Sequence, residues 1–145
     1  MSQPTVYRTS SAEETIAAGR RIAAGLRGPQ LVLLIGDLGA GKTTLTKGIV
    51  SGLGAAAPED VLSPTFALMH ELGDDPKVYH LDLYRLDRLP ELETLGLDDL
   101  WDEEAIVLIE WGEKFADRLP TPRLEIRLRE LGDESREIEI IEVNA

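Results

Sequence analysis

The feature that most constrains the fold is an apolar run that leads directly into a glycine-rich loop. The run is QLVLLIG, residues 30–36, and its unbroken hydrophobicity is typical of a strand buried on both faces of a sheet. Helical sequence follows, from Lys42 to Leu53. The pattern G-x-x-x-x-G-K-[ST] is completed by Gly36, Gly41, Lys42 and Thr43. The order of strand, glycine loop and helix predicts a phosphate-binding loop.

Each part of this loop has a chemical reason. Glycines let successive backbone N–H groups point at one centre, and the helix that follows adds its positive end. We expect Lys42 to reach between the β- and γ-phosphates and the Thr43 hydroxyl to join a Mg²⁺ shell. Gly39 and Ala40 are expected to shape the loop, and Thr44 to serve mainly as a helix residue. The predicted nucleotide-binding loop comprises Gly36, Asp37, Leu38, Gly39, Ala40, Gly41, Lys42, Thr43 and Thr44.

Two carboxylates stand where a metal-assisted nucleotide site needs one. The runs VYHLD and AIVLIE end in Asp82 and Glu110, which would bring both acids to the carboxyl edge of a parallel sheet. Glu110 is favoured as the metal-side acid because its strand is more continuously apolar, although the sequence does not rank the two firmly. The alternative for each acid is a solvent-facing strand end. The predicted catalytic residues are Lys42, Asp82 and Glu110, and the predicted metal ligands are Thr43 and Glu110.

The remaining periodicity predicts an α/β fold. An extended segment around Thr5 precedes a helix that Ser10 or Ser11 can cap and that ends near Gly28. SPTFALMHEL and VYHLDLYRL can pair as a hairpin, and RLEIRLREL and REIEIIEV read as a half-exposed C-terminal β-hairpin. Short acidic helices are expected between Glu91 and Glu104, and another before Pro120. We predict a P-loop NTPase fold with a mixed, mostly parallel sheet flanked by helices, in a single domain spanning residues 1–145.

Composition excludes several classes of function. With 27 acidic and 15 basic residues the net charge is -12, so direct nucleic-acid binding by the chain alone is not expected. The absence of cysteine excludes disulfides, zinc–thiolate sites and thiol catalysis. No stretch resembles a signal peptide or a membrane span, so a cytoplasmic location is expected.

Four blocks together carry a family resemblance. GDLGAGKTT, SPTFALM, YHLDLYRL and LIEW follow one another in an order that resembles the bacterial TsaE (YjeE) family. The resemblance implies an ATPase that requires Mg²⁺ and takes part in the synthesis of tRNA threonylcarbamoyladenosine (t6A). It also implies TsaD and TsaB as protein partners, with hydrolysis resetting or regulating their complex.

The resemblance also assigns roles. It implies that Lys42 and Thr43 hold the phosphates and the metal, that Glu110 is the metal ligand and that Asp82 is a second active-site acid. Trp111 would lie beside the nucleotide, although plain core is an equal alternative, and Arg85 and Tyr84 would form a rim. His80 reads more readily as a satisfied core histidine than as a catalytic base. The implied γ-phosphate switch comprises Ser63, Pro64, Thr65 and Phe66, and Arg136 is the candidate near the base.

The sequence is compatible with rival functions. A small-molecule kinase could use the same loop, but it usually needs a lid with several arginines. A guanine-specific switch is disfavoured because D-x-x-G and N-K-x-D are absent, and a scaffold that rarely hydrolyses nucleotide differs only in rate. We expect slow hydrolysis by the isolated chain, because Arg85 and Arg136 are its only candidates for an arginine finger.

Overall fold

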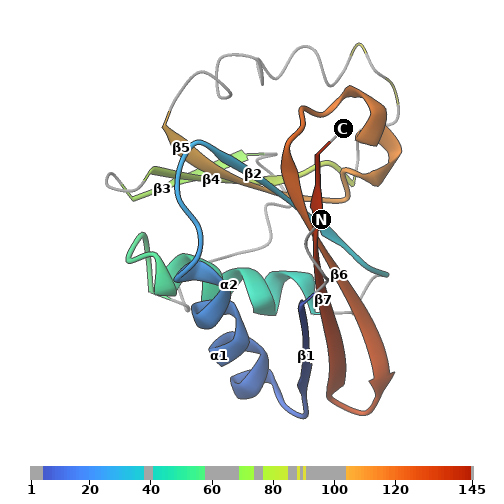
Figure 1. Ribbon diagram of the computed structural model, residues 1–145. Coiled ribbons are helices and arrows are strands. Elements are labelled where there is room, and N and C mark those ends of the chain that lie inside the picture. The colour runs from blue at the N-terminus through green and yellow to red at the C-terminus, as the bar shows by residue number, and fades with distance from the viewer. Residues whose placement is uncertain are drawn as a thin grey trace.

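The structure is a computed structural model that describes residues 5–37, 41–57, 69–73, 77–84, 88, 90 and 104–144. Within these residues seven strands form one sheet in the order β1-β7-β6-β2-β5-β4-β3 (Figure 1). The strands are β1 (Thr5–Thr9), β2 (Gln30–Ile35), β3 (Met69–Leu72), β4 (Lys77–Asp82), β5 (Ala105–Glu110), β6 (Arg123–Gly132) and β7 (Ser135–Val143). The helices are α1 (Ala12–Ala23), α2 (Lys42–Gly52) and a 3-10 helix, η2 (Glu113–Arg118).

Strand directions confirm a mixed sheet but correct the expectation that it is mostly parallel. The four central strands β6, β2, β5 and β4 pair in parallel. The other three pairings, β1 with β7, β7 with β6 and β3 with β4, are antiparallel. Parallel and antiparallel pairs are therefore equal in number. The cause is that both predicted hairpins form, one on each side of the parallel strands, and that β1 adds antiparallel to β7 as an edge strand.

Apolar side chains of β2 alternate between two cores, which explains the unbroken hydrophobic run. Val32 and Leu34 face α1 and α2 and are fully buried with Leu108 of β5. Leu33 faces the opposite side, where it joins a cluster containing Ile109 and Phe115 of η2. In Figure 1 the two α-helices lie together on one side of β2, β5 and β4, and the segment containing η2 lies on the other. The prediction of a strand covered on both faces is confirmed.

Helix α1 begins as predicted but ends earlier than expected. Ser11 Oγ accepts a hydrogen bond from the Glu14 backbone N–H at 3.1 Å, and the Glu14 carboxylate accepts one from the Ser10 N–H at 2.9 Å. The helix ends at Ala23, not near Gly28. Bonds from the N–H groups of Gly25 and Leu26 to carbonyls three residues earlier close a final turn. Leu26 is buried in the core after the helix has ended, so the apolar periodicity outlasts the helix.

The two α-helices cross in close contact. A Cβ atom at Gly48 of α2 would collide with the carbonyl oxygen of Ile16 in α1, and one at Gly19 of α1 would lie 2.6 Å from the Leu45 carbonyl oxygen. Glycine at both positions allows the backbones to touch. The contact fixes α2, and with it the residues at the start of α2, relative to α1.

One predicted helical segment lies outside the described residues, and another is confirmed. Residues 91–103, which contain most of the predicted acidic helices, lie outside the described part of the chain. The helix expected before Pro120 is present as η2. In the part of the chain that the structure describes, no helix is both long and apolar enough to cross a bilayer.

Candidate active site

The candidate site is at the carboxyl ends of the central parallel strands. Strand β2 ends at Ile35, directly before the glycine loop, while β5 ends in Glu110 and β4 ends in Asp82. Glu110 is the register partner of Leu34 on one side and of Asp82 on the other. Residues in register on neighbouring strands point to the same face, so the two acids lie side by side on the face that α2 covers. The structure thus brings together the two carboxylates that the sequence proposed.

Gly41 joins the loop to α2 in a backbone conformation suited to glycine. It is the N-cap residue of α2, with φ of 100° and ψ of 18°, a left-handed region that strains any residue with a Cβ atom. No side chain caps this end, and the first turn of α2 contains no acid. The first N–H groups of a helix lack intrahelical partners and attract anions. The start of α2 therefore fits the phosphate-binding role.

Lys42 is buried against the loop and a tryptophan ring. The residue is 5% exposed, and Nζ donates a hydrogen bond to the Gly36 carbonyl at 2.6 Å. Nζ also lies 3.1 Å from the centroid of the Trp111 ring, a cation–π contact. Burial lowers the pKa of Lys42, and the nearby negative charges act in the opposite direction. These charges belong to Glu113, Glu110, Asp82 and Asp37.

Glu110 is the most enclosed acid of the site. It is 2% exposed. The Thr43 hydroxyl donates to its two carboxylate oxygens, with distances of 3.3 Å to Oε1 and 3.4 Å to Oε2. His80 Nε2 lies 2.5 Å from Oε2. The acid thus connects the end of β5 to the first turn of α2 and to β4.

Asp82 is less enclosed and has its own backbone partner. Its Oδ1 accepts a hydrogen bond from the Tyr84 N–H at 2.9 Å. Burial raises the pKa of Asp82, the Tyr84 hydrogen bond lowers it, and the neighbouring charge of Glu110 raises it further. A carboxyl group with a raised pKa beside a second acid is a common feature of functional sites.

Trp111 follows β5 in a strained conformation. Its φ of 60° lies in the left-handed region, which a bulky side chain seldom adopts. The ring is half-buried, contacts Lys42 and meets the Tyr84 ring edge-on with centroids 5.0 Å apart. The structure therefore places Trp111 at the site and not in the deep core. Backbone strain of this kind persists where the surroundings impose it, often at functional sites.

The protein groups fit a magnesium ion bound together with phosphate. The Thr43 hydroxyl and the carboxylates of Glu110 and Asp82 supply the hard oxygen donors that Mg²⁺ prefers. Among the described residues, no group of three or more acids and histidines is arranged to hold a metal ion. Mg²⁺ commonly takes one or two carboxylates and completes its shell with water and substrate phosphates.

Arg136 reaches the loop from the C-terminal hairpin. Its Nη1 donates to the carbonyls of Asp133 and Ser135 at 3.1 and 2.9 Å. Its Nε lies 3.5 Å from where a Cβ atom of Gly41 would be. A small cavity beside the loop is lined by Ala12, Thr15, Gly41, Thr44, Glu134 and Arg136. Arg136 and Thr44 therefore lie next to the loop, on different elements.

Some predicted site residues lie outside the described part of the chain, and two neighbours of the site were not predicted as members. Leu38, Gly39, Ala40, Ser63, Pro64, Thr65, Phe66 and Arg85 lie outside the described residues. Glu113, absent from the predicted site, is the largest charge influence on Lys42, and its Oε1 is buried without a hydrogen-bond partner among the described residues. His80, read as a core histidine, is buried but contacts Glu110. The sequence signal that could have predicted this contact is the spacing of His80 two residues before Asp82, which places both on the same face of β4.

Fold and site together define an α/β protein with a glycine loop between a central strand and a helix, and with paired carboxylates beside that helix. The family model for the "Threonylcarbamoyl adenosine biosynthesis protein TsaE" matches residues 9–138. The chain therefore belongs to the TsaE family, which takes part in the biosynthesis of tRNA t6A.

Individual relatives agree with this assignment. The chain is similar to the tRNA threonylcarbamoyladenosine biosynthesis protein TsaE of Bacillus subtilis, with 41% identity over 91% of this chain and 82% of the relative. The TsaE protein of Streptomyces coelicolor is 43% identical over 86% of each chain. A crystal structure of Bacillus subtilis YdiB superposes with a TM-score of 0.80 at 34% identity, covering 99% of this chain and 88% of that one.

Proposed function

We propose that the chain is a Mg²⁺-dependent ATPase that acts in tRNA t6A synthesis, in the cytoplasm, with TsaD and TsaB as partners. The observation that carries the proposal is the hydrogen bond from Thr43, in the first turn of an uncapped helix, to the buried carboxylate of Glu110. It joins the phosphate-binding end of α2 to an acid from a neighbouring strand. This is the pairing that hydrolysis of a metal-bound nucleotide requires.

The charge near Lys42 supports the proposal of a metal ion. Four carboxylates act electrostatically on this one ammonium group, so a triphosphate would meet a net negative site. A bound Mg²⁺ would offset the negative charge and polarise the γ-phosphate. Thr43 and Glu110 are the residues that would hold the ion, with Asp82 beside them.

Lys42 and the loop amides provide the remaining phosphate contacts. The ammonium group has three N–H donors, so it can keep its bond to Gly36 and still bind phosphate oxygens. The N–H groups at the start of α2 point at the same region. Both would stabilise negative charge on the leaving oxygens during in-line attack by water.

Asp82 is the candidate that orients the attacking water. Burial raises its pKa, and general bases work best when their pKa approaches the working pH. Its position beside Glu110 would let it accept a proton close to the metal-bound phosphate. We expect turnover by the chain alone to be slow, with a partner supplying or organising a further cationic group.

The net charge favours protein partners over direct RNA contact. At -12 the chain would be repelled by a tRNA backbone, so its role in t6A synthesis is better served through TsaD and TsaB. We propose that hydrolysis resets or regulates that complex and does not drive the transfer of the threonylcarbamoyl group.

One experiment tests the activity and its purpose together. Phosphate release from ATP is measured with Mg²⁺ for the chain alone and with TsaD–TsaB, and ATP-dependent association is measured by pull-down. The proposal expects slow release alone, faster release with the partners, and association that depends on ATP. Phosphate transfer to a small-molecule acceptor instead of release would favour the alternative, a P-loop small-molecule kinase.

A further inference from the structure

A buried histidine holds the acid of the proposed metal site. His80 is on β4, two residues before Asp82, and is 0% exposed. Its Nε2 lies 2.5 Å from Glu110 Oε2, across the boundary between two parallel strands. The ring is therefore a direct partner of the carboxylate and part of the same cluster as Thr43.

The proposed role of Glu110 as an ionised metal ligand sets the direction of this hydrogen bond. A carboxylate only accepts, so in that role its contact with His80 requires the imidazole proton on Nε2. Among the described residues, His80 Nδ1 is buried and has no hydrogen-bond partner. The bond to Glu110 is thus the polar contact that the structure shows for this ring.

The three distances at Glu110 indicate which partner sets its orientation. The Thr43 hydroxyl is almost equidistant from the two oxygens, at 3.3 and 3.4 Å, and so selects neither of them. His80 is much closer and contacts Oε2 alone. A buried carboxylate is costly unless donors surround it, and hydrogen bonds to ligating groups commonly set their geometry.

We propose that His80 is a positioning residue for the ATPase site, whose Nε2–H holds Glu110 in the orientation that faces Thr43 and so sets how strongly Mg²⁺ binds with nucleotide. This inference rests on the proposed function. The proposed role of His80 differs from a purely structural one because its ring contacts Glu110 at the edge of the sheet. The neighbouring His70 on β3, the register partner of His80, meets that ring edge-on with centroids 6.3 Å apart.

The test compares His80→Gln with His80→Leu. The glutamine amide can place a donor where Nε2 lies, whereas leucine supplies none. Calorimetry measures ADP binding in a Mg²⁺ titration and again in a chelator. For His80→Leu we expect about 10- to 100-fold more Mg²⁺ to be needed, the usual cost of losing such a supporting bond. Binding without Mg²⁺ should be unchanged, because Lys42 and the loop amides remain. His80→Gln should recover most of the Mg²⁺ response.

Matched controls separate the hydrogen bond from general packing. His70→Gln and His70→Leu make the same exchanges on β3 and should leave the Mg²⁺ requirement near that of the parent. Thermal unfolding in chelator confirms that each variant is folded. If His80→Leu does not fold, His80→Asn replaces it, because its amide nitrogen ends near the Nδ1 position and falls short of Glu110.

Two results would overturn the inference. The first is a folded His80→Leu or His80→Asn protein whose Mg²⁺ requirement equals that of the parent. The second is a His80→Gln protein whose Mg²⁺ requirement is raised as much as that of His80→Leu or His80→Asn. The pair can also be tested without ligand, by the NMR resonance of the His80 Nε2 proton, which should shift in Glu110→Gln. A parent protein that binds no nucleotide defeats the proposed function, and an unshifted resonance defeats the His80–Glu110 pair.

Discussion

Two buried glutamates lie on either side of β2 at almost the same level of the sheet. Glu110 on β5 is the register partner of Leu34, and Glu125 on β6 is the register partner of Leu33. They are 2% and 6% exposed, and they point to opposite faces. Their burial is similar, but the groups that bind their oxygens are different.

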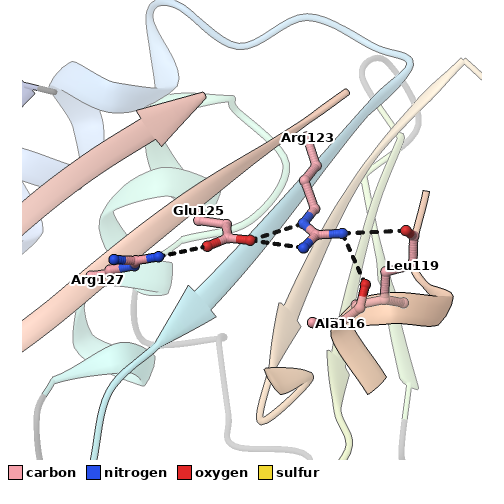
Figure 2. A network of polar contacts seen from close by, with 5 residues as sticks. All are labelled: Ala116, Leu119, Arg123, Glu125 and Arg127. Atoms are coloured by element: carbon pink, nitrogen blue, oxygen red, sulfur yellow. Dashed lines mark hydrogen bonds and ion pairs between the residues drawn. The ribbon is translucent and has the colours of Figure 1, made fainter. Parts of the chain in front are cut away.

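Glu125 is held by two arginines (Figure 2). Arg123 donates from Nε and Nη2 to Oε2 at 3.0 and 2.9 Å, and Arg127 donates to Oε1 at 3.2 Å. Arg123 Nη1 also reaches the carbonyls of Ala116 and Leu119, at 3.1 and 3.2 Å. The cluster therefore joins β6 to the end of η2, and permanent cations offset its negative charge.

Glu110, by contrast, is hydrogen-bonded to a hydroxyl and an imidazole, neither of which is a permanent cation. Its negative charge would then be available to the cation proposed to bind at the start of α2. The comparison teaches that burial alone does not identify a functional acid. A buried acid that is paired with arginines supports the fold, and one whose donors are not permanent cations is suited to bind a metal.

The largest effect is expected at Glu125, the acid paired with arginines, and it concerns the free energy of unfolding. Glu125→Ala leaves Arg123, itself nearly buried, without its carboxylate, and breaking a buried ion pair costs about 3 to 5 kcal/mol. Urea unfolding should show this loss, while nucleotide affinity of the folded protein stays unchanged. A loss below about 1 kcal/mol, the range of a surface pair, would remove the contrast between the two acids.

The second-largest effect is expected at Glu110, and it concerns the rate of ATP hydrolysis. Glu110→Gln keeps oxygen and shape but removes the charge, so ATP hydrolysis should fall about 100-fold, which is about 2.7 kcal/mol in the barrier. Its free energy of unfolding should equal or exceed that of the parent, because no arginine loses a partner. Phosphate release and urea unfolding measure the two quantities. Turnover equal to that of the parent would take Glu110 out of the mechanism.

A third, smaller effect compares the two arginines. Arg127 is half exposed whereas Arg123 is nearly buried, although both contact Glu125. Arg127→Ala should therefore cost at most about 1 kcal/mol of unfolding free energy. Arg123→Ala should cost clearly more, and the same urea experiment ranks them. Equal losses would show that burial does not determine the strength of this cluster.

The smallest effect concerns Asp82 and pH. Because its pKa is raised in the folded protein, the folded state retains this proton at pH values above 3.8 where the unfolded chain has lost it. Stability should therefore fall as pH rises from 3.8 through the folded pKa of Asp82. Asp82→Asn keeps an acceptor for the Tyr84 N–H. The substitution should flatten this part of the curve of stability against pH and slightly stabilise the protein at neutral pH. Unfolding midpoints of both proteins across acidic pH test this, and identical slopes would contradict it.

Much of the fold could be predicted because its signals are local. Continuous apolar runs predict β2 and β5, turn residues predict both hairpins, and parallel strands bring Asp82 and Glu110 to one edge. The balance of parallel and antiparallel pairs could not be predicted, because it depends on where the hairpins join the sheet. The end of α1 was missed because Leu26 continues the helical pattern from a turn.

The side-chain clusters were harder to predict, since they depend on register and on what covers each face. RLEIR alternates like a half-exposed strand, but η2 covers this part of β6, and Glu125 is buried. Thirty residues separate His80 from Glu110, and only the pairing of β4 with β5 brings them together. Lys42 and Thr43 could be identified because their positions are fixed by a contiguous loop pattern.

Under the proposed function, the close crossing of α1 and α2 would limit the size of the ligand. α2 begins with Lys42 and Thr43, while α1 begins with Ala12 and contributes Thr15 to the cavity beside Arg136. Because the backbones touch at Gly48, neither helix can slide or turn without moving the other. The distance from the start of α2 to that cavity is therefore fixed, and under the proposed function a nucleotide of the wrong length would not be accommodated by shifting one helix alone.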